Sequence, residues 1–225
     1  TVLKRIAVTG AIMALPRRMT AQSSEGRAAI LSYLAAHARP DNGYAFADQV
    51  RSHLTPTFAV IGCYHLLEKQ PPNRGALGDF LRANHPRELK RQQRERRQFD
   101  YQQIQSLVWL GDDAADFREQ IRPQIAPRPY PKISERQGHP VFQSELAVVQ
   151  CHALLGLPLT SLAPAFTDYV VSRRRANGSF NNTPTSEGGD GHVMNTLWGL
   201  QAQQTLRIPE LKKISTAAWL RSAQL

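Results

Sequence analysis

The sequence is poor in cysteine, and this shortage excludes a whole class of proteins. Of its 225 residues only two are cysteines, Cys63 and Cys151, and neither belongs to a Cys-x-x-Cys pair. Two cysteines do not make a disulfide framework of the kind that holds small secreted domains together. Both lie in apolar, helix-like sequence, so we predict two buried and unpaired thiols.

The sequence also lacks an apolar run long enough to cross a bilayer, which needs about 20 residues. Near the N-terminus Ile6–Leu15 is only ten residues long and follows Lys4 and Arg5. A basic start and a short apolar run resemble a signal peptide, although two arginines follow at once and no small-x-small cleavage site is present. We predict that residues 1–22 are either a terminal helix packed on a cytoplasmic domain or a signal-like segment of an exported protein.

The chain has fewer acidic than basic residues: 18 aspartates and glutamates against 28 lysines and arginines, which gives a formal net charge of +10. Such a charge favours an anionic partner: nucleic acid, acidic lipid or a phosphorylated small molecule. Much of it lies in Arg87–Arg97, which has six basic and two acidic residues but no aromatic one. This composition is typical of a solvated face and not of a surface that stacks nucleic-acid bases. A nucleic-acid-binding helical repeat is therefore the weaker alternative.

Strand-like alternation of apolar and polar residues is missing as well, whereas apolar residues recur at helical spacing between clusters of proline and glycine. The chain is therefore predicted to be all-α. A further helix is expected from Pro209 onward, and the proline-rich residues Ala126–Pro131 are expected to form a loop. The predicted helices are Arg27–Ala38, Thr55–Glu68, Gly75–Asn84, Phe99–Leu110, Asp116–Ile125, Phe142–Leu155, Leu162–Arg174 and His192–Thr205.

Two Asn-Gly turns suggest an internal repeat. Gly43 and Gly178 are 135 positions apart, three times 45. A pair of helices every 45–50 residues gives four to five pairs over residues 23–225. Such a pattern is typical of a solenoid or a closed ring, in which each pair buries its apolar face against its neighbours.

The two best copies resemble a known repeat. Asn42-Gly43-Tyr44-Ala45-Phe46 and Asn177-Gly178-Ser179-Phe180 match its turn, while Thr55-x-Thr57 and Thr196-Leu-Trp-Gly199-Leu200-Gln-Ala202 match its second helix. Over residues 25–225 the chain is similar to the prenyltransferase and squalene-oxidase repeats of the terpenoid cyclase and protein prenyltransferase α/α toroids. The resemblance implies a ring of inner and outer helices around a funnel. A full ring of that family has six pairs, so this ring is either open or completed by a protein partner or by further sequence.

The resemblance also implies a function. In catalytic members the funnel holds an isoprenoid or its diphosphate, so the chain is expected to be a transferase or a cyclase relative. The alternative is a non-catalytic toroid that serves as a binding or scaffolding module. By analogy the funnel would be lined by Thr57, Phe58, Tyr101, Glu145, His192, Asn195 and Trp198.

Charged residues near the expected funnel supply the remaining candidates. Three consecutive arginines, Arg173, Arg174 and Arg175, suit the oxygens of a diphosphate, with Arg128 and Lys132 as a second cluster. Their alternative role is a solvated helix end, where basic residues suit the helix dipole. The candidate catalytic residues are His192, Asp190 and Glu145.

The metal and acid motifs of the family are incomplete. Protein prenyltransferases bind zinc through an Asp-x-Cys pair and a histidine; His192 matches the histidine, but the preceding helix begins Val141-Phe142-Gln143 and Cys151 lies about two turns further on. We therefore expect no cofactor and no zinc.

The Asp-x-Asp-Asp acid of the cyclases is absent. Asp112–Asp116 reads DDxxD, a magnesium diphosphate motif elsewhere, but its place after a glycine predicts a helix N-cap with first-turn acids.

Overall fold

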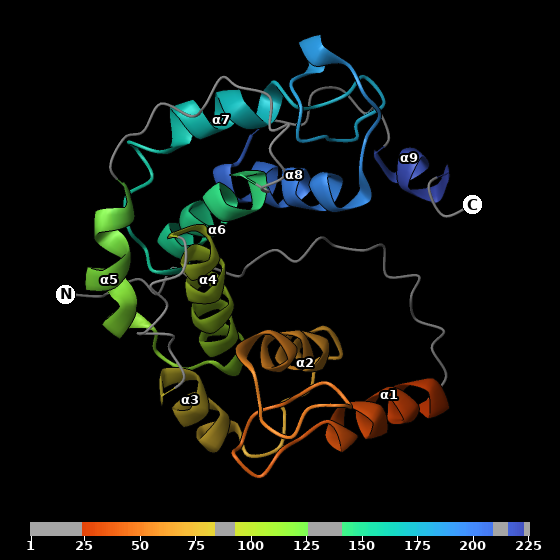
Figure 1. Cartoon of the computed structure of the whole chain (residues 1–225), viewed down its shortest axis with the longest axis vertical. Coiled ribbons are helices and arrows are strands. Elements are labelled where there is room, and N and C mark those ends of the chain that lie inside the picture. Colours follow the sequence, from red (N-terminus) through yellow and green to blue (C-terminus); the bar gives the residue numbers. More distant parts are fainter. Residues whose placement is uncertain (1–23, 84–92, 126–140, 209–215, 223–225) are drawn as a thin grey trace, which may run out of the picture. The chain divides into compact units, whose positions relative to one another are not determined.

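The computed structural model describes residues 24–83, 93–125, 141–208 and 216–222. Most of the described residues are helical, and no β-strand forms among them, which confirms the all-α prediction (Figure 1). The elements are α1 (Ser24–Ala36), α2 (Leu54–Leu66), α3 (Arg74–Ala83), α4 (Gln93–Leu110), η2 (Ala115–Phe117), α5 (Arg118–Ile121), η3 (Arg122–Ile125), α6 (Val141–Leu154), α7 (Ala163–Val171), η4 (Thr185–Glu187), α8 (Val193–Leu206) and α9 (Thr216–Ser222).

Most predicted helices agree with the structure to within a few residues, and the differences have physical reasons. The helix expected to reach Arg174 ends at Val171, because the next residues turn into a hairpin. The segment before Ile125 changes from 3₁₀ to α and back, with Pro123 inside it. The basic run is helical from Gln93. The terminal segment 1–22, Arg128, Lys132, the loop Ala126–Pro131 and the helix start at Pro209 lie outside the described residues.

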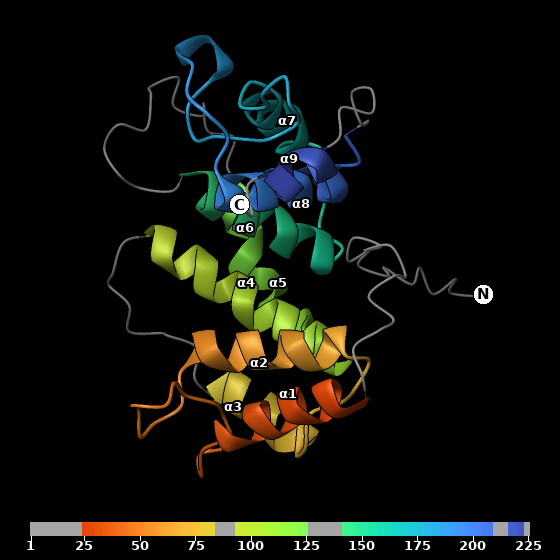
Figure 2. The ribbon, with the colours of Figure 1, turned by 90° about the vertical axis from the view of Figure 1, so that its right-hand side faces the viewer.

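The chain divides into two compact units, which we call the N-terminal unit (residues 1–84 and 106–112) and the C-terminal unit (residues 85–105 and 113–225). In the C-terminal unit α6 and α8 lie side by side and α7 packs against α8 (Figures 1 and 2). Their shared core is aromatic: the ring of Phe142 lies within 6.4 Å of the rings of Phe166 and Phe180, and within 5.8 Å of Tyr169.

In the N-terminal unit, side chains from α2, α3 and the last turns of α4 are buried together. Ile61, Leu81 and Leu107 have almost no exposed surface. Tyr44 is also buried, and burial together with the neighbouring Tyr64 hydroxyl raises the pKa of Tyr44 to about 12. Both cysteines are free; Cys151 is buried as predicted, whereas Cys63 is half-exposed. In the described part of the chain, every helix is too short or too polar to cross a membrane.

Candidate functional site

Each unit contains a hairpin that ends one helix and leads into a loop. Its tight turn requires a left-handed residue, Asn42 at φ 68° in the N-terminal unit and Gly178 at φ 82° in the C-terminal unit. Asparagine and glycine adopt this region at the least cost. The predicted alignment of Gly43 with Gly178 is therefore one residue out. The two hairpins have equivalent backbone bonds. In the N-terminal unit the Arg39 N–H donates to the Gly43 carbonyl and the Asn42 N–H donates to the Arg39 carbonyl. In the C-terminal unit the Arg175 N–H donates to the Ser179 carbonyl and the Gly178 N–H donates to the Arg175 carbonyl.

A histidine begins the helix after each hairpin. His53 precedes α2 and His192 precedes α8, both with extended backbone. The N–H of His53 donates to the carbonyl of Tyr44 at 3.0 Å, and that of His192 to the carbonyl of Phe180 at 2.8 Å. Both imidazoles are exposed. The structure thus gives His192, a predicted catalytic residue, a counterpart that sequence reasoning missed.

A buried threonine four residues later ties each helix to its hairpin. Thr57 and Thr196 have no exposed surface. The Thr57 hydroxyl accepts the N–H of Tyr44 at 2.9 Å, and the Thr196 hydroxyl accepts the N–H of Phe180 at 3.0 Å. The shared His-x-x-x-Thr spacing is the signal that would have aligned the two copies. We call this combination of hairpin, loop, histidine and threonine the hairpin module.

An arginine at the start of the hairpin fixes the loop of the C-terminal module. Arg175 Nε donates to the carbonyl of Gly189 at 2.8 Å, and Nη2 donates to the carbonyl of Gly188 at 2.7 Å. Nη1 reaches the carbonyl of Thr183 at 3.1 Å. Burial, with the nearby charge of Arg173, lowers the pKa of the Arg175 guanidinium. The buried Arg175 guanidinium therefore holds the glycine-rich loop in place through these hydrogen bonds.

Arg39 does the same in the N-terminal module, with fewer bonds. Its Nε donates to the carbonyl of Gln49 and its Nη2 to the carbonyl of Phe46, both at 2.9 Å. Arg39 is the second functional candidate that sequence reasoning missed, since an isolated arginine after a helix carries no distinctive signal.

The arginines predicted to bind diphosphate have protein partners. Arg173 is 3% exposed, lies 3.4 Å above the ring centroid of Tyr169 and donates to the carbonyl of Asn182. Arg175 is bound to the loop as described, and Arg174 is half-buried. Buried guanidiniums need acceptors, which the loop carbonyls supply here, and the charge of Asp190 also acts on Arg175. Phosphate binding by this cluster stays a prediction.

Three further predicted residues lie in or just after the same loop, in different surroundings. Asp190 is exposed, and its carbonyl accepts the side-chain N–H of Asn181. Asn195 is buried in the first turn of α8. Trp198 joins the aromatic core, edge-on to Phe142 at 6.4 Å between centroids. Trp198 therefore packs against the aromatic core of the C-terminal unit.

The predicted acid Glu145 belongs to a buried polar layer between α4, α6 and the α5–η3 segment. Its carboxylate pairs with Arg97, which is 5% exposed. One helical turn further on, the fully buried Asp100 accepts the side-chain N–H of Gln120 at 2.7 Å and that of Gln124 at 3.0 Å. These bonds give both carboxylates structural partners.

Three protonatable groups flank this layer. Burial raises the pKa of the predicted substrate residue Tyr101 to about 12 and raises that of the Cys151 thiol well above its usual range. Burial lowers the pKa of His152, whose Nε2 lies 3.4 Å from the carbonyl of Ile121. At neutral pH the layer therefore holds a neutral phenol, a thiol and a neutral imidazole beside its carboxylates.

Phe58, another predicted substrate residue, is part of an aromatic stack in the N-terminal unit. The Trp109 ring lies 5.2 Å from the Phe58 ring and 5.4 Å from the His65 ring, each at 22° between planes. A Cβ on Gly62 would lie 3.0 Å from this indole, so a glycine lets the ring rest on α2. All three rings are half-exposed, and burial lowers the pKa of His65. The stack offers a flat, uncharged aromatic surface.

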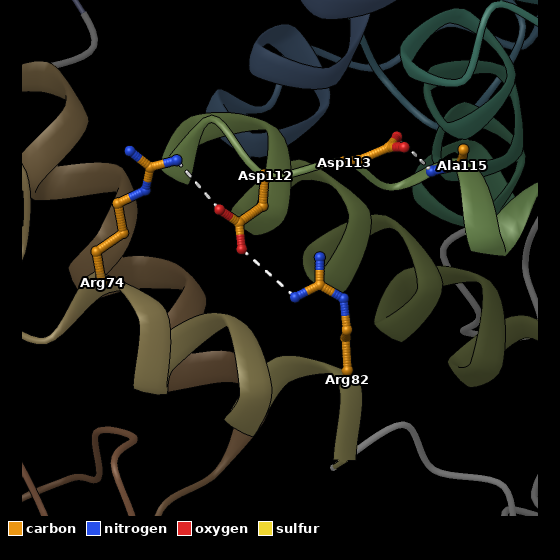
Figure 3. Close-up of polar contacts among 5 residues, drawn as sticks. All are labelled: Arg74, Arg82, Asp112, Asp113 and Ala115. Atoms are coloured by element: carbon orange, nitrogen blue, oxygen red, sulfur yellow. Dashed lines mark hydrogen bonds and ion pairs between the residues drawn. The ribbon is translucent and has the colours of Figure 1, made fainter.

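The first aspartate of the DDxxD sequence connects α4 to α3. Asp112 Oδ1 accepts from Arg74 at 3.2 Å and Oδ2 from Arg82 at 3.4 Å (Figure 3). The carboxylate lies over Gly78, where an added Cβ would be only 2.4 Å from Oδ2. Two guanidiniums therefore surround Asp112, where a metal site would need further carboxylates.

The N-cap of η2 is Ala114, which makes no side-chain cap bond, so the predicted N-cap is not an aspartate; Asp113 lies one residue before it. Asp113 Oδ1 accepts the N–H of Ala115, the first residue of η2, at 2.9 Å (Figure 3). Asp116 is exposed. Throughout the described ranges, His, Cys, Asp and Glu side chains nowhere gather in groups of three or more that could hold a metal ion.

Comparison with protein families, with curated proteins and with solved structures found no match to this chain.

Proposed function

We propose that the chain is a helical-repeat protein of the α/α-toroid type that binds an isoprenoid or an isoprenyl diphosphate. The observation that carries the proposal is the recurrence of the hairpin module with equivalent hydrogen bonds in both units. Duplicated backbone bonding is what a repeat architecture requires, and here the copies are 136 residues apart in the hairpin and 139 residues apart at the histidine and threonine. The module also contains the residues on which the resemblance to the toroid repeats rests.

The ligand class follows from the aromatic stack on α2 and α4. An isoprenoid chain is a branched hydrocarbon with double bonds, and it packs well on half-exposed aromatic faces. The faces available are those of Phe58, Trp109 and neutral His65. The net charge of +10 favours a diphosphate over an uncharged polyene.

A non-catalytic binding or scaffolding module is the second candidate, and one observation favours it. Among the predicted catalytic residues Glu145 pairs with Arg97, and the arginines expected to meet the diphosphate donate to loop carbonyls instead. A general acid or a phosphate clamp needs free donors facing the substrate.

Thermal unfolding with and without farnesyl or geranylgeranyl diphosphate tests the proposal. A ligand at a hundredfold excess over its Kd stabilises the folded state by about 2.7 kcal/mol. We expect a raised Tm in the wild type, a smaller rise in Trp109→Leu and an unchanged rise in Leu66→Ala, which alters an exposed residue of α2.

Inorganic diphosphate and a diphosphate-release assay complete the experiment. An equal rise with inorganic diphosphate would show anion binding without isoprenoid recognition. Release of diphosphate would establish an enzyme. No rise with any of these compounds would contradict isoprenoid binding and favour the scaffolding module.

A further inference from the structure

The first turn of α8 contains a buried side-chain amide, that of Asn195. Asn195 is the third residue of the helix and is only 4% exposed. Its amide has no hydrogen-bond partner among the residues that the structure describes, and α8 has no side-chain cap. Because a buried polar group without a partner lowers stability, such a group in a folded protein points to a ligand that completes its bonding.

Backbone donors lie in the same turn. The N–H of Thr196 donates to the carbonyl of His192 at 2.8 Å. The three N–H groups before it have no partner in the described part of the chain; they belong to Val193, Met194 and Asn195. Side chains on a helix lean toward its N-terminus, so the Asn195 amide lies beside these N–H groups. Together they offer an anion three backbone donors and the NH2 of an amide, at the positive end of the helix dipole.

The start of α8 is held in place by its neighbours. A Cβ added to Gly191 would collide with the Ser179 side chain and lie 3.1 Å from the Trp219 ring, so α9 lies beside this turn (Figure 1). The Thr216 hydroxyl of α9 donates to the carbonyl of Gly178 at 3.0 Å. His192 is exposed and lies three residues before Asn195, so its imidazole is on the same side of the turn.

The charges of the preceding segment also favour an anion. Residues 173–192 contain three arginines but only two acidic residues, Glu187 and Asp190. Arg173 and Arg175 are buried, whereas both acidic side chains are exposed and therefore more strongly screened by water. The charge of Arg173 also lowers the pKa of Arg175, which places the two guanidiniums close together. A bound anion would reduce the repulsion between them.

The N-terminal module lacks this arrangement. Its threonine, Thr57, corresponds to Thr196, so the residue that corresponds to Asn195 is Pro56. Proline has neither a side-chain amide nor a backbone N–H. The donor cluster is therefore a property of the C-terminal module, and the chain supplies its own control.

From the buried amide, the three backbone N–H groups and the excess of basic residues, we propose that the start of α8 binds the phosphate group of a small molecule. The imidazole of His192 is a further donor to the phosphate oxygens. Exposed apolar side chains adjoin the turn, with Val193 50% exposed, Met194 43% and Leu197 38%. An apolar chain on the phosphate would pack on them. The site is separate from the aromatic stack on α2 and α4, and it does not depend on isoprenoid binding.

Titration of the full chain with inorganic phosphate, followed by amide NMR spectra at constant ionic strength, tests the proposal. The amide signals of Val193, Met194 and Asn195 should shift and saturate. Asn195→Asp should weaken phosphate binding at least about tenfold, because it removes two donors and adds a repelling charge. An aspartate suits the first turn of a helix, so the variant should fold.

Two histidine variants provide a second measurement that does not alter a buried residue. His192→Gln should weaken phosphate binding about two- to tenfold, since it changes one exposed donor. His53→Gln changes the corresponding histidine before α2 and should leave the Kd unchanged. Hexyl phosphate then distinguishes the sources of the phosphate group: tighter binding than inorganic phosphate, lost in Leu197→Ser, assigns the site to a phosphate ester with an apolar chain, and equal binding assigns it to free phosphate.

Three results would overturn the proposal. One is a titration in which the signals of residues 193–195 do not move. Another is a shift that rises without saturation, as expected of general ionic effects. The third is a Kd that both Asn195→Asp and His192→Gln leave unchanged, which would place the bound phosphate elsewhere on this basic chain.

Discussion

The two hairpin modules have the same backbone bonds but different side chains around them. In both, a left-handed residue makes the turn, a histidine N–H closes the loop and a threonine hydroxyl accepts the hairpin N–H. The C-terminal loop is longer and glycine-rich, and its arginine makes more bonds than Arg39 does. The comparison teaches that a few polar contacts define the module, while loop length and packing are free to vary between copies.

The largest difference between the modules is at the third position after the threonine. In the C-terminal unit this residue is Gly199, and an added Cβ would lie 2.4 Å from the buried Phe180 ring. In the N-terminal unit the same position is occupied by Val60. We expect Gly199→Ala to lower the free energy of unfolding by about 3 kcal/mol, since the rigid ring must move. Val60→Ala should lower it by about 1–2 kcal/mol through a cavity. Urea unfolding measures both; equal losses would contradict the packing difference.

The loop arginines come next. Arg175→Ala should cost about 2–3 kcal/mol, because it removes several charged hydrogen bonds and leaves loop carbonyls without donors. Arg39→Ala should cost only about 1 kcal/mol, because the guanidinium is half-exposed and makes fewer bonds. The lysine variants at both positions are matched controls that keep the charge. A larger loss of unfolding free energy in Arg39→Ala than in Arg175→Ala would contradict the conclusion that Arg175 stabilises its loop more strongly.

The threonines should behave alike, which tests the shared part of the comparison. Thr57→Val and Thr196→Val keep the shape of the side chain but remove the acceptor for a buried hairpin N–H. Each should cost about 1–2 kcal/mol. Hydrogen exchange should become faster at the Tyr44 amide in the first variant and at the Phe180 amide in the second. If either variant left its amide protected, the two modules would not be equivalent.

Acid should weaken the C-terminal unit more than the N-terminal unit. Burial lowers the pKa of both His152 and His65, but His152 is fully buried and His65 is half-exposed. The unfolded chain then binds protons below the usual histidine pKa of about 6.5, where the folded chain does not, so stability falls as pH falls. The largest slope for one histidine is about 1.4 kcal/mol per pH unit.

Replacing His152 by Gln should flatten this pH dependence between about pH 6.5 and pH 5. His65→Gln should flatten it less. Unfolding free energies measured across this range, with both single variants, decide the point. A slope that His152→Gln leaves unchanged would assign the acid sensitivity elsewhere.

The smallest effect is expected at the left-handed turn residues. Gly178→Asn and Asn42→Gly exchange the two residues that the modules use at this position, and each should change stability by no more than about 0.5 kcal/mol. Gly178→Val should cost more than about 1 kcal/mol, because a β-branched residue is strained at φ 82°. A large loss in Asn42→Gly would mean that the Asn42 side chain matters beyond its backbone.

Local sequence patterns predicted the helices well and the contacts between them poorly. Apolar spacing located α2 and α8 to within about two residues, because amphipathic periodicity and the preceding turns are local properties. The pairing of Asp112 with Arg74 is not local: the two residues are 38 positions apart and meet only because a glycine on α3 leaves room. For the same reason Trp109 was missed, since its neighbours on α2 lie far away in the sequence.

The candidate site was predicted only in part. Residue types predict phosphate binding at Arg173–Arg175, which stays a prediction, whereas the bonds from Arg173 and Arg175 to loop carbonyls could not be predicted from the sequence. The bond from the Ala115 N–H to Asp113 depends only on local sequence, because an Asp that accepts the N–H two residues further on is a local turn motif. The one-residue error in the repeat came from matching glycines, whereas the fold matches backbone conformation, which Asn42 and Gly178 share.

The aromatic stack gives the N-terminal unit an optical signal of its own. Trp109 is the tryptophan of that unit, and it lies against an imidazole that is neutral at physiological pH. A protonated imidazole quenches indole emission far more strongly than a neutral one. Trp109 fluorescence should therefore decrease as His65 is protonated. In a chain with Trp198 and Trp219 replaced by Phe, the remaining fluorescence would report the protonation of His65 and its stacking on Trp109.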